Sequence, residues 1–234
     1  MREVFHDTLE DIQNRLVEIS ELVAEAIEKA TRAFATRDVA LAEEVIANDD
    51  YIDHLVLTTD EIAIETLAMQ QPVAHDLRVI VSALRASASL ERMGDLADHI
   101  AQLVRSRYPE RAIPQGLMPV FERMGRLDVQ VARTLTTLLR TQDLQYATQI
   151  RDTDDEIDEL HASVYERVLG DSFGGEIPHA IDATLASRYH ERFADHAVSV
   201  AKKVVYLATG DWSGADDDFD EIEAPAEAPE NTEA

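Results

Sequence analysis

Residues 9–26 read LEDIQNRLVEISELVAEA, and apolar side chains recur in this segment every three or four positions. This spacing is typical of an amphipathic α-helix with one buried face. The apolar series consists of Leu9, Ile12, Leu16, Ile19, Leu22 or Val23, and Ala26. No glycine or proline occurs before Pro72, so neither helix-breaking residue type interrupts the pattern up to that point.

Similar apolar spacing continues along the chain, and a few residues divide it into six predicted helices. Asp38 is a typical N-cap residue and splits the first 71 residues into two helices. Pro72 is expected in the first turn of a third helix that runs to Ser106. The last three helices are predicted at residues 120–140, 144–169 and 177–209. Because no segment alternates apolar and polar side chains as a strand does, the predicted fold class is all-α.

The second half of the chain repeats the first. An offset of 105 aligns Asp49 and Asp53 with Asp154 and Asp158 in the second helix of each half. An offset of 100 aligns the third helices, and the change falls between helices, where length changes cost little. We therefore predict two homologous antiparallel three-helix bundles in tandem, built from six long helices packed lengthwise.

The positions of proline, glycine and charged residues set the predicted boundaries of the bundles, the linker and the tail. Residues 1–108 form the first bundle, residues 109–119 a linker rich in proline, and residues 120–210 the second bundle. Residues 211–234 hold ten of the 47 acidic residues and no basic one. Such a segment buries too little apolar surface to offset its ordering entropy, so we predict a disordered acidic tail.

The amino-acid composition excludes several classes of function. The 234 residues carry a formal net charge of −26, which repels nucleic-acid phosphates and anionic membrane surfaces. The chain has no cysteine, which excludes disulfides and thiolate chemistry and fits a reducing compartment. The longest segments without a charged side chain have ten residues, whereas a membrane-spanning helix needs about 20. We expect a cytoplasmic protein that neither binds nucleic acid nor inserts directly into a membrane.

Four pairs of acidic residues lie four positions apart at equivalent points of the two halves: Asp49/Asp53, Glu91/Asp95, Asp154/Asp158 and Glu191/Asp195. Residues four apart share one helix face, so the two like charges of each pair repel unless solvent, a basic group or a cation offsets them. A single pair of this kind in an acidic chain is usually a solvated surface feature. Recurrence in both halves favours a specific role.

The acid pairs also lie on or beside the apolar helix faces that we expect to be buried. The third helix carries Leu77, Ile80 with Val81, Leu84 and Ala88, and the same series leads to Glu91 and Asp95. In the fifth helix, Asp154 lies between Ile150 and Ile157. An unpaired charge on a packed face is costly, so a cation shared between helices is the favoured interpretation. Ion pairs with Arg92 or Arg192, or solvation at the surface, remain alternatives.

No catalytic motif stands out. The chain contains no phosphate-binding loop and no His-Glu-x-x-His motif, so we predict a protein that is not an enzyme. His161 follows Asp158 by three residues and could join a cluster, but a histidine that only forms hydrogen bonds is the preferred interpretation.

Four short segments give the chain a family likeness. They are residues 49–53 (DDYID), 71–78 (QPVAHDLR), 90–97 (LERMGDLA) and 191–197 (ERFADHA). Together these motifs resemble the PhoU family, accessory regulators of bacterial phosphate uptake, over about residues 1–210. Phe193-Ala194 replaces Met93-Gly94, and no second Asp-Leu-Arg follows Pro178, so the second half departs from the pattern.

The resemblance implies a cytoplasmic homodimer that acts as a negative regulator. It would connect the ATPase subunit of the high-affinity phosphate ABC transporter to a sensor histidine kinase, and damp uptake and the phosphate-starvation response when phosphate is plentiful. Some family members carry multinuclear iron or zinc clusters on such acid pairs, and manganese or magnesium is a further possibility. The implied metal ligands here are Asp49, Asp53, Glu91, Asp95, Asp154, Asp158, Glu191 and Asp195. A carboxylate-bridged metal redox or storage protein and a metal-free helical scaffold are the alternatives.

Overall fold

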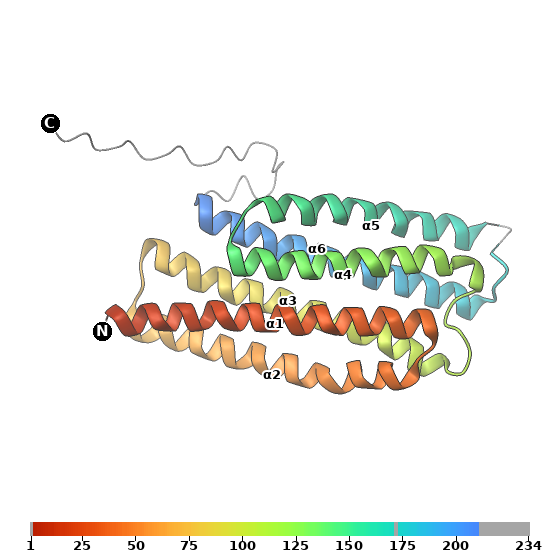
Figure 1. Ribbon diagram of the computed structural model, residues 1–234, viewed down its shortest axis with the longest axis horizontal. Coiled ribbons are helices and arrows are strands. Elements are labelled where there is room, and N and C mark those ends of the chain that lie inside the picture. Colours follow the sequence, from red (N-terminus) through yellow and green to blue (C-terminus); the bar gives the residue numbers. More distant parts are fainter. Residues whose placement is uncertain (1, 171–172, 211–234) are drawn as a thin grey trace.

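The computed structural model describes residues 2–170 and 173–210, and this part of the chain folds into six long helices without any strand (Figure 1). They are α1 (Arg2–Thr36), α2 (Val39–Gln70), α3 (Ala74–Arg107), α4 (Met118–Thr141), α5 (Gln145–Leu169) and α6 (Ile177–Thr209), with a short 3-10 helix, η1 (Gln115–Leu117), before α4. The predicted all-α fold is confirmed. The predicted disordered tail, residues 211–234, lies outside the described residues.

Local signals explain most helix ends. The Asp38 carboxylate caps α2 as predicted, because its Oδ1 accepts the Leu41 backbone N–H at 3.1 Å. The prediction for Pro72 was wrong: α3 begins at Ala74, after the extended residue Val73, so Pro72 precedes the helix. The left-handed conformation of Gln71 ends α2 just before, and the connection between the two helices is therefore short.

The two bundles lie side by side along their length. Figure 1 shows α1 next to α4 and α3 next to α6, with α2 and α5 on opposite flanks, and these two pairs make the contacts between the halves. Small side chains let α1 and α4 approach closely: a Cβ atom at Gly125 would lie 2.9 Å from Cβ of Thr31. At the equivalent point of the other half, Ser20 Oγ donates a hydrogen bond to Thr136 Oγ1 at 2.9 Å.

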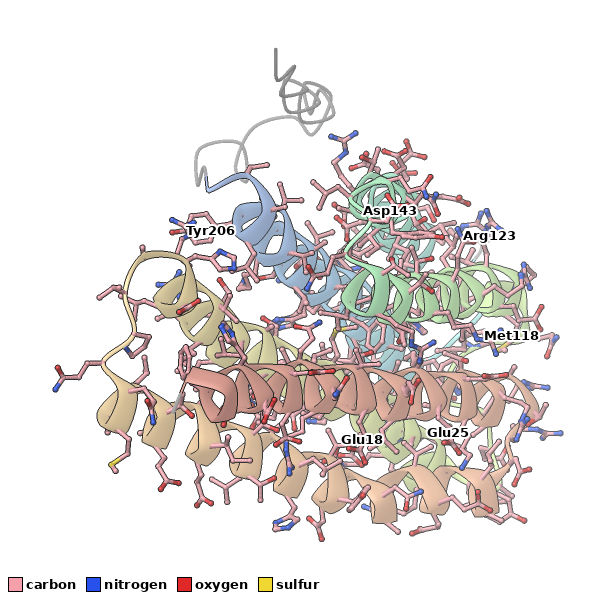
Figure 2. All side chains as sticks on the ribbon, turned by 60° about the vertical axis from the view of Figure 1, so that its left-hand side comes forward. Glu18, Glu25, Met118, Arg123, Asp143 and Tyr206 are labelled. Carbon is pink, nitrogen blue, oxygen red and sulfur yellow. The ribbon has the colours of Figure 1, made fainter. Side chains whose placement is uncertain are left out.

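The inward face of α1 is the predicted one. Ile12, Leu16, Ile19 and Val23 are almost fully buried, whereas Leu9 is half-buried. Burying one such side chain stabilises the fold by about 1.5–3 kcal/mol relative to leaving it exposed. Side chains fill the space between the helices, and at the surface Arg123 joins α4 to α5 through a bidentate pair with Glu156 at 2.7 Å (Figure 2).

The predicted inward face of α3 was wrong. Only Ile80 of the expected series is buried, and Leu77, Val81 and Ala88 are exposed. The buried face consists largely of small residues, among them Ala83, Ala86, Ser87, Gly94, Ala97 and Ala101. This small-residue face packs against α1, α2 and α6 and lets these helices approach α3 closely.

None of the described helices has an apolar run long enough to cross a bilayer, which agrees with the prediction from the sequence.

Candidate functional site

The first cluster of carboxylates lies between α2 and α3. One oxygen atom each from Asp49, Asp53 and Asp95 can be chosen so that all three lie within 4.8 Å of one another. The structure thus brings residues of two separate acid pairs together across two helices. Gly94 of α3 lies beside this cluster, and a Cβ atom there would make an ordinary contact of 3.4 Å with Asp49 Oδ1.

Burial and mutual repulsion disfavour the charged forms of these acids. The pKa of Asp49 is raised to about 7, first by burial and then by the charges of Asp98, Asp53 and Asp95. Burial also raises the pKa of Asp53 and of Glu91. The cluster therefore carries negative charge that its surroundings compensate only in part.

One arginine offsets some of that charge. Arg92 Nη1 lies 2.6 Å from Asp95 Oδ2, and its Nε lies 3.9 Å from Glu91 Oε2. The predicted ion pair with Arg92 is thus present, but the side chain is largely exposed, where ion pairs contribute little to stability. Arg92 does not reach Asp49, which has no basic partner in the described part of the chain.

Asp98 belongs to the same region, and the sequence reasoning missed it. Its side chain is buried, its Oδ2 accepts a hydrogen bond from Gln102, and its Oδ1 has no hydrogen-bond partner within residues 2–170 and 173–210. It is also the largest electrostatic contributor to the raised pKa of Asp49. Its position three residues after Asp95, almost one turn further along α3, was a signal that could have been used.

The second cluster lies between α5 and α6 and contains the four predicted acids. The pKa of Asp154 is raised to about 7 by burial and then by the charges of Asp158 and Asp195. Asp154 Oδ1 and Glu191 Oε2 are buried and have no hydrogen-bond partner among the residues that the structure describes. Glu191 pairs with Arg188, whereas the described part of the chain shows no ion pair between Glu191 and the predicted partner Arg192.

The two clusters differ in geometry. In the described residues, only the first brings three ligand atoms within 4.8 Å of one another. His161, three residues after Asp158, forms a hydrogen bond with α6, because its Nδ1 lies 3.0 Å from Ser187 Oγ. This hydrogen bond agrees with the preferred interpretation of that histidine.

A buried ionisable pair in the second bundle was also missed. Nδ1 of His190 on α6 lies 2.5 Å from Oδ2 of Asp128 on α4, and both side chains are fully buried. Burial raises the pKa of Asp128 to about 6, although His190 counteracts the effect. The equivalent positions of the first bundle hold Val23 and Leu90, both buried.

Comparison with known proteins matches this duplicated architecture. A family model described as the PhoU domain fits residues 16–104 and fits again over residues 121–204. The chain belongs to the PhoU family. The resemblance seen in the sequence is therefore confirmed, and the two matched segments correspond to the two bundles.

PhoU proteins are also similar to this chain over nearly its whole length. The phosphate-specific transport system accessory protein PhoU homolog 2 of Mycobacterium tuberculosis is 40% identical over 210 residues, covering 90% of this chain and 99% of that protein. The crystal structure of PhoU from Pseudomonas aeruginosa has a TM-score of 0.81 at 27% identity, covering 88% and 100% of the two chains. The phosphate transport system regulatory protein PhoU from Streptococcus pneumoniae has a TM-score of 0.79 at 26% identity, covering 89% and 98%.

Proposed function

We propose that this protein is a cytoplasmic accessory regulator of phosphate transport that restrains uptake and the phosphate-starvation response when phosphate is plentiful. The observation that carries the proposal is similarity to a phosphate-specific transport system accessory protein over 90% of the chain. The proposed mechanism is partner binding without turnover. The proposed partners are the ATPase subunit of the transporter and a sensor histidine kinase, and the proposed oligomeric state is a homodimer.

Gene deletion tests the regulatory role. Cells without the gene should take up more radiolabelled phosphate in phosphate-rich medium, and a starvation-promoter reporter should be more active. A plasmid copy should restore both. Unchanged uptake and reporter activity, in a strain without a second PhoU gene, would contradict the proposal.

The partners require a separate experiment. Pull-downs with the purified tagged protein at high and low phosphate should recover the transporter ATPase subunit and the kinase, and light scattering should give the mass of a dimer. A deletion phenotype without recovery of the kinase would retain the transport role and reject the link to the kinase.

We further propose that the two clusters bind metal ions. Carboxylate oxygens are suitable ligands for magnesium, manganese, iron and zinc, and the chain has no cysteine that would favour softer metals. Three oxygens converge in the first cluster, and two buried oxygens without hydrogen-bond partners point to the same role in the second. A bound cation would supply positive charge, while Asp49 and Asp53 from α2 and Asp95 from α3 would hold two helices together through it.

Elemental analysis tests this second proposal. Protein purified without chelator should contain iron, zinc or manganese, and the variant Asp49→Asn/Asp53→Asn/Asp95→Asn should contain less. Glu61→Gln/Glu65→Gln is the matched control, because this pair is also four residues apart on α2 but faces solvent. A metal content equal to background, with no rise in melting temperature on adding metal, would favour a metal-free scaffold. Iron-dependent oxygen consumption would favour a redox or storage protein.

A further inference from the structure

Two rows of exposed apolar side chains lie on the helical hairpins that carry the carboxylate clusters. Stripe 1 comprises Leu57 and Ile64 of α2 with Leu77 and Val81 of α3; stripe 2 comprises Tyr165 and Leu169 of α5 with Ile177 and Ile181 of α6. These side chains are between 36% and 84% exposed. Soluble monomers rarely expose large contiguous apolar patches, and such patches usually mark binding surfaces.

Each stripe leads into a cluster. Along α3, steps of three or four residues connect Leu77 and Val81 through Leu84 and Ala88 to Glu91 and Asp95. Such steps keep side chains on one helix face, so the apolar row and the acids share that face. The face of α3 that was predicted to point inward therefore points outward, and it is apolar at one end and acidic at the other.

The partner helix contributes to the same surface. Ser87 Oγ of α3 donates a hydrogen bond to Asp60 Oδ1 of α2 at 2.8 Å, and Asp53 meets Asp95 about two turns further along. These contacts set the antiparallel register of the hairpin and bring Ile64 level with Leu84. Stripe 1 is thus one surface made by two helices rather than isolated exposed residues.

Duplication is the second observation. The offset of 105 that aligns the acids of α2 and α5 also aligns Ile64 with Leu169. The offset of 100 that aligns Glu91 with Glu191 also aligns Leu77 with Ile177, and Val81 with Ile181. The side chains have diverged but remain apolar and exposed in both halves. Because exposed positions are not required to be apolar for folding, this repetition indicates a shared binding role.

We propose that each stripe binds a basic amphipathic helical segment of another protein, one segment per bundle. Apolar side chains of the segment would cover the stripe, and its lysine or arginine side chains would face the acidic end. Charge complementarity favours this occupant, because the chain has a net charge of −26 and its own arginines only partly offset the acids. A second copy of the same chain and an anionic membrane would both bring further negative charge to these surfaces.

A designed peptide tests the proposal directly. The probe is a synthetic helix with leucine on one face and lysine on the other, titrated by calorimetry into the full-length, metal-free protein. We expect two peptides bound per chain. The same peptide with glutamate in place of lysine should bind at least about tenfold more weakly, since only the charge has changed.

Stripe variants assign the two binding events. Leu77→Ser/Val81→Ser should remove one peptide, Ile177→Ser/Ile181→Ser the other, and the quadruple variant both. All four side chains are exposed, so helicity and melting temperature should stay near the wild-type values. Tyr108→Ser is the matched control: the side chain is exposed and apolar but lies outside both stripes, and it should leave two peptides bound.

Several results would overturn the proposal. The first is equal binding of the glutamate and lysine peptides. The second is binding of the lysine peptide that the stripe variants do not change. The third is self-association, or binding to neutral phosphatidylcholine vesicles, where the stripe variants abolish either one. The inference rests on the proposed function only in that an accessory regulator must contact another protein. Peptide titration does not measure phosphate uptake, so this surface and the regulatory role can fail independently.

Discussion

The two bundles share a backbone design but differ in what surrounds their carboxylates. In the first, Gly94 lies beside Asp49, and one oxygen each from Asp49, Asp53 and Asp95 converge. In the second, the equivalent of Gly94 is the fully buried Ala194, and Asp154 has a buried oxygen that finds no hydrogen-bond partner in the described part of the chain. Duplication therefore retained the acids while their packing diverged, and the two clusters should differ in cation affinity.

A second difference lies in the core. The first bundle buries Val23 and Leu90 where the second buries Asp128 and His190. Because an apolar pair serves this position in the first bundle, the ionisable pair is not required by the architecture. Substitutions that exchange features between the bundles can therefore test what each difference contributes.

The largest expected effect comes from breaking the buried pair. His190→Ala should reduce the free energy of unfolding by about 3–5 kcal/mol, because Asp128 would remain buried without its partner. Asp128→Val/His190→Leu, which copies the first bundle, should be neutral or stabilising by about 1–4 kcal/mol. Urea unfolding measures both. If His190→Ala were as stable as the wild type, breaking the buried pair would have little effect on the free energy of unfolding.

The next effect concerns pH. The pKa values of Asp49 and Asp154 are raised from 3.8 to about 7, so the folded metal-free protein holds protons that the unfolded chain releases. The contribution of these two protonated side chains to the free energy of unfolding is fully present below about pH 4. It is lost as the pH rises through about 7. The free energy of unfolding should fall across this range.

Two variants test the source of that pH dependence. Asp49→Asn/Asp154→Asn should flatten the decrease, because asparagine does not titrate. Asp152→Asn, at an exposed position on α5, should leave it unchanged. If the slope survives in the first variant, other groups cause it.

Close packing between α1 and α4 predicts a smaller effect. Gly125→Ala should destabilise the protein by about 1–3 kcal/mol, because its methyl group would meet Thr31 at 2.9 Å. At the equivalent position, Ser20→Ala should cost only about 0.5–1.5 kcal/mol for the lost hydrogen bond to Thr136. The ranking of the two variants in thermal unfolding checks the comparison, and equal losses would contradict it.

The smallest effect is expected beside the first cluster. Gly94→Ala should stabilise α3 by about 0.5–1 kcal/mol, since a Cβ atom there makes ordinary contacts of 3.4 Å with Asp49 and Ile52. Ala194→Gly, the reverse change, should destabilise α6. A loss of stability in Gly94→Ala would mean that α3 cannot accommodate the methyl group.

Local signals made much of the fold predictable. The apolar spacing in α1 and the cap at Asp38 depend on neighbouring residues, so the helices and their duplication could be inferred from the sequence. The outward face of α3 could not, because Leu77 and Val81 have the spacing of a core face, and which face of α3 points inward depends on where α1, α2 and α6 pack against it. Periodicity identifies a face but not the side on which it lies.

The candidate site was predictable only where it depends on residues that are neighbours along one helix. Spacing showed that Asp49 and Asp53 share a face, but their approach to Asp95 depends on the register between α2 and α3. Asp128 and His190 are 62 residues apart and have no local signal of contact. Comparing the repeats would have found them, since each replaces an apolar residue of the first bundle with an ionisable one.

The long contact of α1 with α4 and of α3 with α6 means that the two halves do not depend on the peptide that joins them. Cleaving the chain after Pro109 would leave two fragments with most of their mutual surface intact, which should stay together as a non-covalent heterodimer. The same arrangement is what one ancestral three-helix unit would form by pairing with itself about a two-fold axis. Gene fusion would then have made two initially identical carboxylate clusters free to specialise.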